Sequence, residues 1–226
     1  MEQAQQELAK LVETALGQGY QPLITGGGHE VTFGHYLGIH QYLHKISADE
    51  AKNSLGIINF DAHFDLREPA ENGTHSGTGF FQIARHSQEN ARPFNCLPIG
   101  IQQISNTRHL FSTAENLGIS HISAQQFNPL REKEILEQIS QFMERSAHIY
   151  LTIDLDVFSV AVAPGVSAPA YSGIFPDHLF FSCLDLIISS GKLISMDIAE
   201  YNPVYDTDQH TARLAAALAF RMISEK

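Results

Sequence analysis

Short apolar segments alternate along this chain with longer segments whose apolar residues recur every three or four positions. The short runs indicate buried strands, and the longer period indicates helices. Alternation of this kind favours parallel βαβ units, so we predict an α/β fold: a three-layer sandwich with a doubly wound, mainly parallel sheet of about six strands. The expected strands end at residue 25 or span 55–60, 95–101, 118–122, 147–156 and 192–200, and the expected helices cover the N-terminal segment, 30–46, 107–117, 130–145, 176–190 and 208–224.

The composition narrows the classes of protein that this chain could be. With 226 residues, of which 43% are hydrophobic, it can bury one sizeable core, and we predict a single domain over 1–226. A formal net charge of −11 without a basic cluster argues against nucleic acid as a partner. No apolar run reaches about 18 residues and the N-terminus has no signal-peptide pattern, which argues against membranes and secretion. Cys96 and Cys183 form no CxxC pair, so a reducing cytoplasm is expected.

Acidic and imidazole side chains gather where the predicted strands end. The sequence "DAHFD" places Asp61, His63 and Asp65 on alternate residues, so that in an extended segment all three project to one side. Because ligand sites of open α/β sheets lie beyond the carboxyl ends of the strands, other polar groups at strand ends should meet them there. Such groups occur in "GGGHE", "TIDLD" and "MDIAE", namely His29, Asp154, Asp156, Asp197 and Glu200.

Carboxylates crowded into one dry cleft need a cation. Each would otherwise raise the pKa of its neighbours and destabilise the fold. Histidine and aspartate ligands without cysteine suit Mn²⁺, Fe²⁺, Co²⁺ or Zn²⁺, and aspartates able to bridge favour two ions roughly 3.5 to 4 Å apart. Taken singly, each motif could be no more than a capped turn at a strand end. Taken together, the motifs predict a dinuclear metal site.

The ordered set "GGGHE", "DAHFD", "TIDLD" and "MDIAEYNP" resembles the ureohydrolase family of arginase, agmatinase and formimidoylglutamase, whose arginase-like fold is then expected. Within that family, "DAHFDLR" and "DLDVFSVAVAPGVSAPA" are most similar to formimidoylglutamase. Arginases and agmatinases usually have an Asp-Pro pair shortly after the second acidic motif, where this chain has Ser159 and Val160. The resemblance therefore implies cleavage of N-formimidoyl-L-glutamate to L-glutamate and formamide, a step of histidine degradation.

The resemblance also implies two manganese ions per chain and a ligand set for each. A hydroxide bridging the two ions would attack the amidine carbon of the small-molecule substrate, because the metals lower the pKa of bound water from 15.7 to around 7. Asp61 and Asp154 would bridge the ions. One ion would be held by His29, Asp61, Asp65 and Asp154, and the other by Asp61, His63, Asp154 and Asp156.

Four residues receive roles in catalysis or substrate binding in this implied reaction. Asp65 would orient the hydroxide, and Glu200 would face the cationic nitrogens of the substrate. His75 in "NGTHSG" would protonate the departing amine. Arg67 would receive a substrate carboxylate, since a guanidinium can grip one with two hydrogen bonds.

This chain departs from the family pattern at its N-terminus. Members of the family usually carry two further strands before "GGGHE", so we expect an N-terminally truncated domain whose strand ending at Thr25 is an unpaired edge. A homo-oligomer could compensate for the missing strands. The alternatives are an agmatinase- or arginase-type guanidino hydrolase, a zinc deacetylase of related architecture, or an inactive metal-binding fragment that acts as an interaction module.

Overall fold

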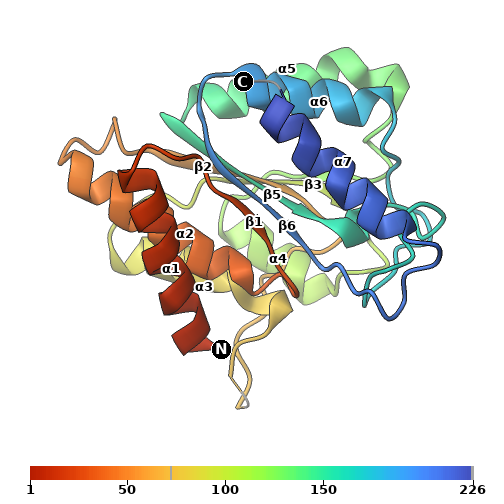
Figure 1. The fold of residues 1–226 in the computed structure, drawn as a ribbon, viewed down its shortest axis with the longest axis horizontal. Coiled ribbons are helices and arrows are strands. Elements are labelled where there is room, and N and C mark those ends of the chain that lie inside the picture. The colour runs from red at the N-terminus through yellow and green to blue at the C-terminus, as the bar shows by residue number, and fades with distance from the viewer. Residues whose placement is uncertain (72, 225–226) are drawn as a thin grey trace.

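The computed structural model describes residues 1–71 and 73–224, which form a six-stranded parallel sheet between two layers of helices (Figure 1). The strand order is β1-β6-β5-β2-β3-β4, and every pair is parallel. The helices are α1 (Glu2–Gly17), α2 (Val31–Ile46), α3 (Gly79–Glu89), α4 (Arg108–Asn116), α5 (Glu132–Glu144), α6 (His178–Ser189) and α7 (His210–Ser224). The strands are β1 (Leu23–Thr25), β2 (Leu55–Phe60), β3 (Cys96–Ile101), β4 (Ile122–Ser123), β5 (His148–Asp154) and β6 (Leu193–Ala199). The predicted fold class is confirmed.

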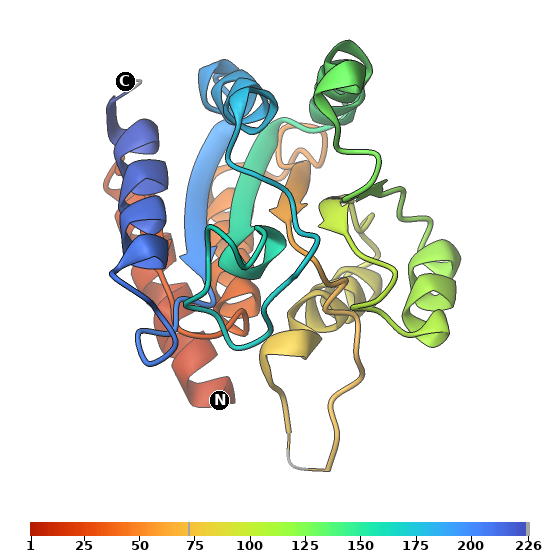
Figure 2. The ribbon, with the colours of Figure 1, turned by 90° about the vertical axis from the view of Figure 1, so that its right-hand side faces the viewer.

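The two faces of the sheet have separate cores because side chains alternate along each strand. Along β5, Ile149, Leu151 and Ile153 belong to the core beneath α5, α6 and α7, and Tyr150 belongs to the core beneath α1, α2, α3 and α4. Figure 2 shows the sheet between these two groups of helices. Thr152 and Asp154 have the same parity as Tyr150, so they lie on the face that α2 covers.

The strands expected at 55–60, 95–101, 147–156 and 192–200 are confirmed within one or two residues at each end. The expected strand at 118–122 is wrong over most of its length, because β4 contains only Ile122 and Ser123. Gly118 adopts φ 69°, and its N–H and that of Ile119 bond back to carbonyls of α4. These residues therefore end the helix rather than begin a strand.

One helix was not predicted from the sequence. Helix α3 follows the loop that contains "DAHFDLR", and it buries Phe80, Ile83, Ala84 and Ser87. Those four residues have the i, i+3, i+4, i+7 spacing of a helix face, which is the signal that could have revealed it. The other five helices expected after the N-terminal helix all form.

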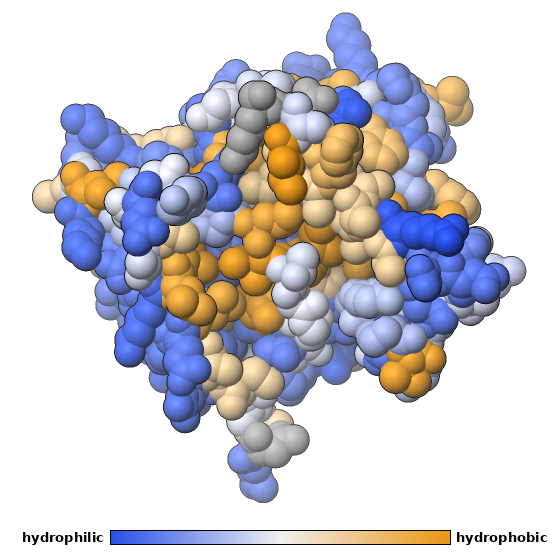
Figure 3. Space-filling view, in the orientation of Figure 1, coloured by the Kyte–Doolittle hydropathy of each residue, from blue (hydrophilic) through white to orange (hydrophobic). Residues whose placement is uncertain are grey.

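Strand β1 lies at an edge of the sheet and, among the described residues, pairs only with β6. The expected edge position of this strand is thus confirmed. Helices α1 and α7 flank it, and Figure 3 shows apolar residues gathered over the region between them. Leu11 and Phe220 are 68% and 69% exposed, and Tyr20 and Ile223 are also largely exposed.

Within residues 1–71 and 73–224, none of the helices combines the length and the hydrophobicity needed to cross a membrane.

Candidate metal centre

Four neighbouring strands bring the predicted ligands to one edge of the sheet. His29 follows β1, Asp61 follows β2, Asp154 is the last residue of β5, and Glu200 follows β6. Parallel strands point their carboxyl ends the same way, so the order β1-β6-β5-β2 places these residues side by side. The long loops expected at 64–77 and 157–175 leave this same edge, after β2 and β5.

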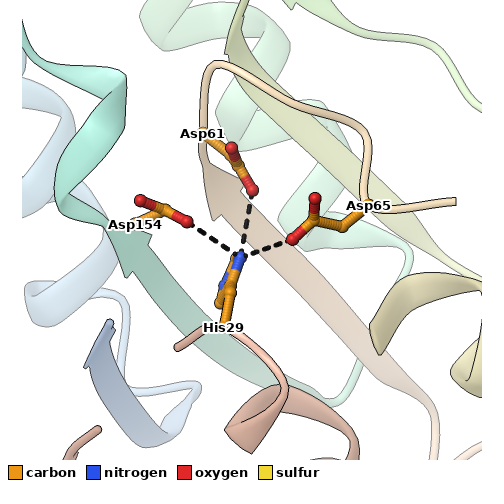
Figure 4. A group of neighbouring side chains, drawn as sticks. All are labelled: His29, Asp61, Asp65 and Asp154. Carbon is orange, nitrogen blue, oxygen red and sulfur yellow. Dashed lines mark hydrogen bonds and ion pairs between the residues drawn. The ribbon is translucent and has the colours of Figure 1, made fainter. Parts of the chain in front are cut away.

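The first cluster centres on the imidazole of His29. Its Nδ1 lies 3.1 Å from Oδ2 of Asp61, 3.0 Å from Oδ2 of Asp65 and 3.2 Å from Oδ2 of Asp154 (Figure 4). All four side chains are buried. The structure therefore brings together the complete set predicted for one ion.

The second cluster lies beside the first and shares Asp61 with it. It contains Asp61, His63 and Asp156, with Nδ1 of His63 at 3.0 Å from Oδ2 of Asp156 and 3.5 Å from Oδ1 of Asp61. Three of the four residues predicted for the second ion are thus grouped. The fourth, Asp154, is grouped with the first cluster, so its bridging role stays a prediction.

The ligands converge through turns, and the expected extended geometry is wrong. Strand β2 ends at Phe60, and Oδ1 of Asp61 accepts a hydrogen bond from the backbone N–H of His63 at 2.7 Å. An aspartate that bonds a backbone N–H two residues ahead closes a tight turn, which competes with strand continuation. Asp65 then adopts φ 50°, in the left-handed region, and this turns its carboxylate back towards His29.

Left-handed backbone occurs at two of the predicted site residues. Besides Asp65, Glu200 has φ 65°, and neither residue is a glycine. Such a conformation is unfavourable for a side chain with a Cβ and persists only where other contacts impose it. For Glu200 those contacts are with the segment that carries His29: its N–H donates to the Gly27 carbonyl at 2.6 Å, and its Oε1 accepts from the His29 N–H at 2.9 Å.

Burial and mutual repulsion raise the pKa values of three of the clustered acids, whereas hydrogen bonds from histidines lower that of the fourth. Burial raises the pKa of Asp65 to about 6, with a further contribution from the charge of Asp61, and burial raises the pKa of Asp156 to about 6. Burial and the charges of Asp156 and Asp61 also raise the pKa of Asp154 well above its usual value. For Asp61, burial acts in the same direction, but hydrogen bonds from His29 and His63 outweigh it and lower the pKa.

Both histidines respond to the surrounding carboxylates. Burial alone would lower the pKa of each, but hydrogen bonds and charge from the aspartates raise the pKa of His63 to about 12 and that of His29 well above its usual value. Without a bound cation, these groups would attract protons strongly. A cation bound among these groups would replace those protons.

The donor set fits divalent metal ions. Nδ1 of His29 carries at most one hydrogen, yet three carboxylate oxygens lie within 3.2 Å of it, so hydrogen bonding alone cannot satisfy all three. Oδ1 of Asp156 is buried and has no hydrogen-bond partner among the described residues. Oxygen and imidazole donors without sulfur suit manganese, iron, cobalt or zinc. The types of donor atom and their arrangement therefore support the predicted metal-binding character of the site.

A cavity of about 180 Å³ opens above the clusters. Asp65, Asp154 and Asp156 form its floor together with His63, and the predicted residues Arg67, His75 and Glu200 also line it. The structure therefore gathers every predicted site residue around one space, with His29 and Asp61 buried beneath it.

Glu200 reaches this cavity past Gly28. A Cβ at Gly28 would lie 3.2 Å from Oε1 of Glu200 and 2.1 Å from Oε2 of Glu30, so a larger residue would displace these carboxylates. Burial raises the pKa of Glu200, and the negative charge of Asp156 adds to this effect. A cationic group entering the cavity would stabilise the ionised form of Glu200.

His75 and Arg67 enter the cavity from the loop after β2. His75 caps the short 3₁₀ helix Ser76–Thr78, and its Nδ1 accepts a hydrogen bond from the Gly77 N–H at 3.1 Å. Arg67 is exposed, and no ion pair involves its guanidinium within the part of the chain that the structure describes.

Two supporting residues were not assigned these roles from the sequence. Asn106 braces the ligand loop: its Oδ1 accepts from the Phe64 N–H at 3.0 Å, and its Nδ2 donates to the Ala62 carbonyl at 2.9 Å. Asn59 lies in β2 and donates to Oδ2 of Asp61 at 3.1 Å. Asn59 precedes Asp61 by two residues, which is a weak sequence signal, and no acidic residue near Asn106 in the sequence indicates its role.

Comparison with known protein families gives a match over residues 1–224 to the model described as "Arginase family". The chain belongs to the arginase family. It is 43% identical to the formimidoylglutamase of Paraburkholderia xenovorans over 99% of this chain and 70% of that protein. It therefore spans about 70% of the length of this relative. The predicted resemblance to ureohydrolases, with formimidoylglutamase among the close relatives, is confirmed, and the chain is a formimidoylglutamase-like hydrolase of the arginase family.

Solved structures confirm the arginase-like fold. Arginase from Bacillus subtilis matches with a TM-score of 0.82 and 23% identity, covering 98% of this chain and 78% of that one. Trypanosoma cruzi formiminoglutamase, whose structure was determined with Mn²⁺, matches with a TM-score of 0.81 and 21% identity, covering 99% and 71%. Because an arginase and a formiminoglutamase match almost equally well, the fold does not choose between their substrates.

Proposed function

We propose that this arginase family member is a dinuclear-manganese formimidoylglutamase, which hydrolyses N-formimidoyl-L-glutamate to L-glutamate and formamide. The observation that carries the substrate assignment is the 43% identity with a formimidoylglutamase across nearly the whole of this chain. The gathering of His29, Asp61, Asp65 and Asp154, with His63 and Asp156 beside them, supports the metal chemistry. The catalytic unit in this proposal is the single domain 1–226.

The two clusters would hold the two ions. His29, Asp61, Asp65 and Asp154 would bind one, while Asp61, His63 and Asp156, with Asp154 as a second bridge, would bind the other. Bound divalent ions would supply a strong nucleophile near neutral pH by lowering the pKa of water. Manganese is our choice among the ions that these donors suit, in keeping with the Mn²⁺ of the Trypanosoma cruzi structure.

The residues around the cavity would position the substrate. The Glu200 carboxylate would accept hydrogen bonds from the amidinium group and hold the amidine carbon over the metal ligands. Asp65, whose pKa is raised to about 6, would orient the attacking water. Arg67 would bind a carboxylate of the glutamate moiety, because its guanidinium is exposed at the cavity wall and has no internal ion-pair partner among the described residues.

His75 would complete the reaction by moving one proton. A water oxygen adds to the amidine carbon, the bond from that carbon to the glutamate nitrogen breaks, and the departing nitrogen takes a proton. The ring nitrogen of His75 that does not bond to Gly77 would deliver it. The cap on the 3₁₀ helix would keep the imidazole in this orientation.

A comparative assay tests the proposal. The purified chain is loaded with Mn²⁺, and formamide release from N-formimidoyl-L-glutamate is measured beside urea release from arginine and agmatine. Formamide release with about two Mn²⁺ per chain supports the proposal. Urea release alone would make the protein a guanidino hydrolase, and a single bound Zn²⁺ would favour the deacetylase alternative. Two bound ions with no turnover would favour an inactive metal-binding module.

A Glu200→Gln variant is the matched control for this assay. The glutamine retains the oxygen that accepts from the His29 N–H, but it loses the negative charge. Metal content should stay at the wild-type value while kcat/KM for the amidine falls about 10- to 100-fold, the range for losing a hydrogen bond between charged groups. Full activity of this variant would remove Glu200 from the proposed site.

Self-association and a cytoplasmic location are part of the same proposal. The exposed apolar residues Leu11 of α1, Tyr20, and Phe220 and Ile223 of α7 would be covered in a homo-oligomer. Cys96 and Cys183 are both buried and free, which agrees with a reducing compartment. Sedimentation equilibrium at micromolar protein concentration checks the assembly, and a monomer under these conditions would contradict it.

A further inference from the structure

A chain of buried polar groups extends from the back of His29 into the layer between the sheet and α2. The Nδ1 atom of His29 faces the three aspartates, while its Nε2 lies 2.8 Å from Oγ1 of Thr152. The Thr152 hydroxyl in turn lies 2.5 Å from Oδ1 of Asp197. His29 is 1% exposed, and Thr152 and Asp197 are fully buried, so water does not compete for these bonds.

The direction of these hydrogen bonds determines where the His29 proton lies. A carboxylate can only accept, so the single hydroxyl hydrogen of Thr152 is donated to Asp197. The Thr152 oxygen must then accept a hydrogen from Nε2 of His29. With its proton on Nε2, a neutral His29 presents the lone pair of Nδ1 to the aspartate cluster, which is the tautomer that a metal ligand at this position needs.

Asp197 also has partners on β5 and α2 that favour its role as a hydrogen-bond acceptor. The hydroxyl of Tyr150 donates to Oδ2 of Asp197, and Nδ1 of His35 lies 2.7 Å from the same oxygen. Burial would raise the pKa of Asp197, but the hydrogen bond and charge of His35 outweigh it and lower the pKa, so the ionised form is favoured.

The chain ends on a backbone carbonyl beside β1. Nε2 of His35 lies 2.6 Å from Oγ of Ser195, whose hydroxyl donates to the Pro22 carbonyl at 2.9 Å. A carbonyl can only accept, so the Ser195 oxygen accepts from His35, and both ring nitrogens of His35 donate. The hydrogen bonds therefore converge on the Asp197 carboxylate, from His29 through Thr152 on one side and from Tyr150 and His35 on the other.

We propose that Thr152 and Asp197 are positioning residues for the metal ligand His29, and that they fix its tautomer and ring orientation. The inference rests on the proposed metal-binding role of His29. A buried network of this kind is costly unless every member has a partner, and here the side chains that link His29 to the Pro22 carbonyl all have one. Partners that hold metal-ligating histidines typically contribute 10- to 100-fold to metal affinity.

The first test measures metal binding by two variants of Thr152. Thr152→Val keeps the side-chain shape and removes the hydroxyl, whereas Thr152→Ser keeps the hydroxyl. Mn²⁺ is titrated into each protein, and the free ion is followed by its electron paramagnetic resonance signal. We expect the Val variant to bind one of two ions about 10- to 100-fold more weakly, with the other site little changed, and the Ser variant to stay near wild type.

The second test observes the proton itself. Protein labelled with ¹⁵N-histidine is saturated with diamagnetic Zn²⁺, and the nitrogen shifts and hydrogen exchange of His29 are recorded by NMR. Wild type and the Ser variant should show a slowly exchanging proton on Nε2. The Val variant should lose its protection, because no acceptor remains opposite that nitrogen.

The outcomes separate this inference from the proposed function. If wild type binds no metal, the proposed function fails. If wild type binds two ions and the Val variant binds both with unchanged affinity, only the positioning role fails. A wild-type proton on Nδ1 of His29 in the zinc-loaded protein would also overturn the inference, and that result needs no variant to fold. Equal weakening of both sites in both variants would indicate a general packing effect and would likewise count against it.

Discussion

Asp61 and Asp154 make the same two contacts from neighbouring strands. In each, Oδ1 accepts from the backbone N–H two residues ahead, at 2.7 Å for Asp61 and 2.8 Å for Asp154, and Oδ2 lies 3.1 or 3.2 Å from Nδ1 of His29. Each aspartate thus closes a turn after its strand and contributes one oxygen to the first cluster. The repeated turns also bring His63 and Asp156, the residues two positions on, to within 3.0 Å of each other.

Removing the charge of Asp61 should empty both sites, because Asp61 belongs to both clusters. In Asp61→Asn the amide oxygen can still accept from the His63 N–H, so the turn is kept while a bridging carboxylate is lost. We expect the metal content to fall from about two ions per chain to nearly none. Asp65→Asn is the control: Asp65 belongs to the first cluster only, so one ion should remain. Elemental analysis after gel filtration measures both, and two ions in Asp61→Asn would contradict the shared role.

Arg67→Ala should impair substrate binding rather than chemistry. The guanidinium lies at the wall of the cavity and takes no part in the clusters, so its proposed contact is with a carboxylate remote from the reacting carbon. KM for N-formimidoyl-L-glutamate should rise about 10- to 100-fold with kcat little changed. Arg108→Ala is a suitable control, because Arg108 is also exposed but lines a different cavity. An unchanged KM in Arg67→Ala would remove its proposed role.

Substitution of His75 can separate a structural cap from a proton donor. His75→Asn should retain a side-chain acceptor for the Gly77 N–H, since asparagine is a good N-cap, whereas His75→Ala loses it. Both variants should lose about 10²- to 10⁴-fold in kcat if the imidazole delivers a proton. Only the alanine variant should also lose about 1 kcal/mol of stability in urea unfolding. Wild-type kcat in the asparagine variant would show that His75 serves only as a cap.

The stability of the metal-free protein should decrease as pH rises from about 4 to neutrality. The pKa values of Asp65 and Asp156 are raised to about 6, so the folded state favours their protonated forms, and this contribution is lost as pH rises from 3.8 through 6. The pKa of His63 is raised to about 12, so its contribution is complete below 6.5 and is lost gradually above that value.

Bound metal should reverse this trend, because the ions replace the protons that the site otherwise attracts. Urea unfolding with EDTA and with excess Mn²⁺, at about pH 5 and pH 7.5, measures both slopes. We expect the metal-free protein to be more stable at the lower pH and the metal-loaded protein at the higher pH. Parallel pH dependences in the two series would contradict the assignment of these groups as ligands.

The sequence alone was sufficient to predict the fold class and the residues that gather at the site, but it did not predict how those residues are oriented. Alternation of apolar runs and helical periods predicted the α/β sheet, because burial on both faces demands continuous apolar strands. The residue types and spacing around Asp61 and Asp154 predicted a metal site, because carboxylates crowded together at strand ends need a cation to neutralise them. The short length of β4 escaped this reasoning because it depends on local turn geometry at Gly118, and α3 was missed although its buried residues have helical spacing.

Only the tertiary structure could show how the ligands are aimed and held. Asp61 and Asp65 converge through a side-chain turn and a left-handed residue rather than through an extended strand, and such turns depend on hydrogen bonds that a pattern of residue types does not specify. The chain from His29 through Thr152 to Asp197 joins residues that are 123 and 45 positions apart. Sequence determined which groups reach the edge of the sheet, because that follows from strand period and chain order. Packing between β5, β6 and α2 decided their orientation, because hydrogen-bond direction requires atoms from distant segments to meet in one buried place.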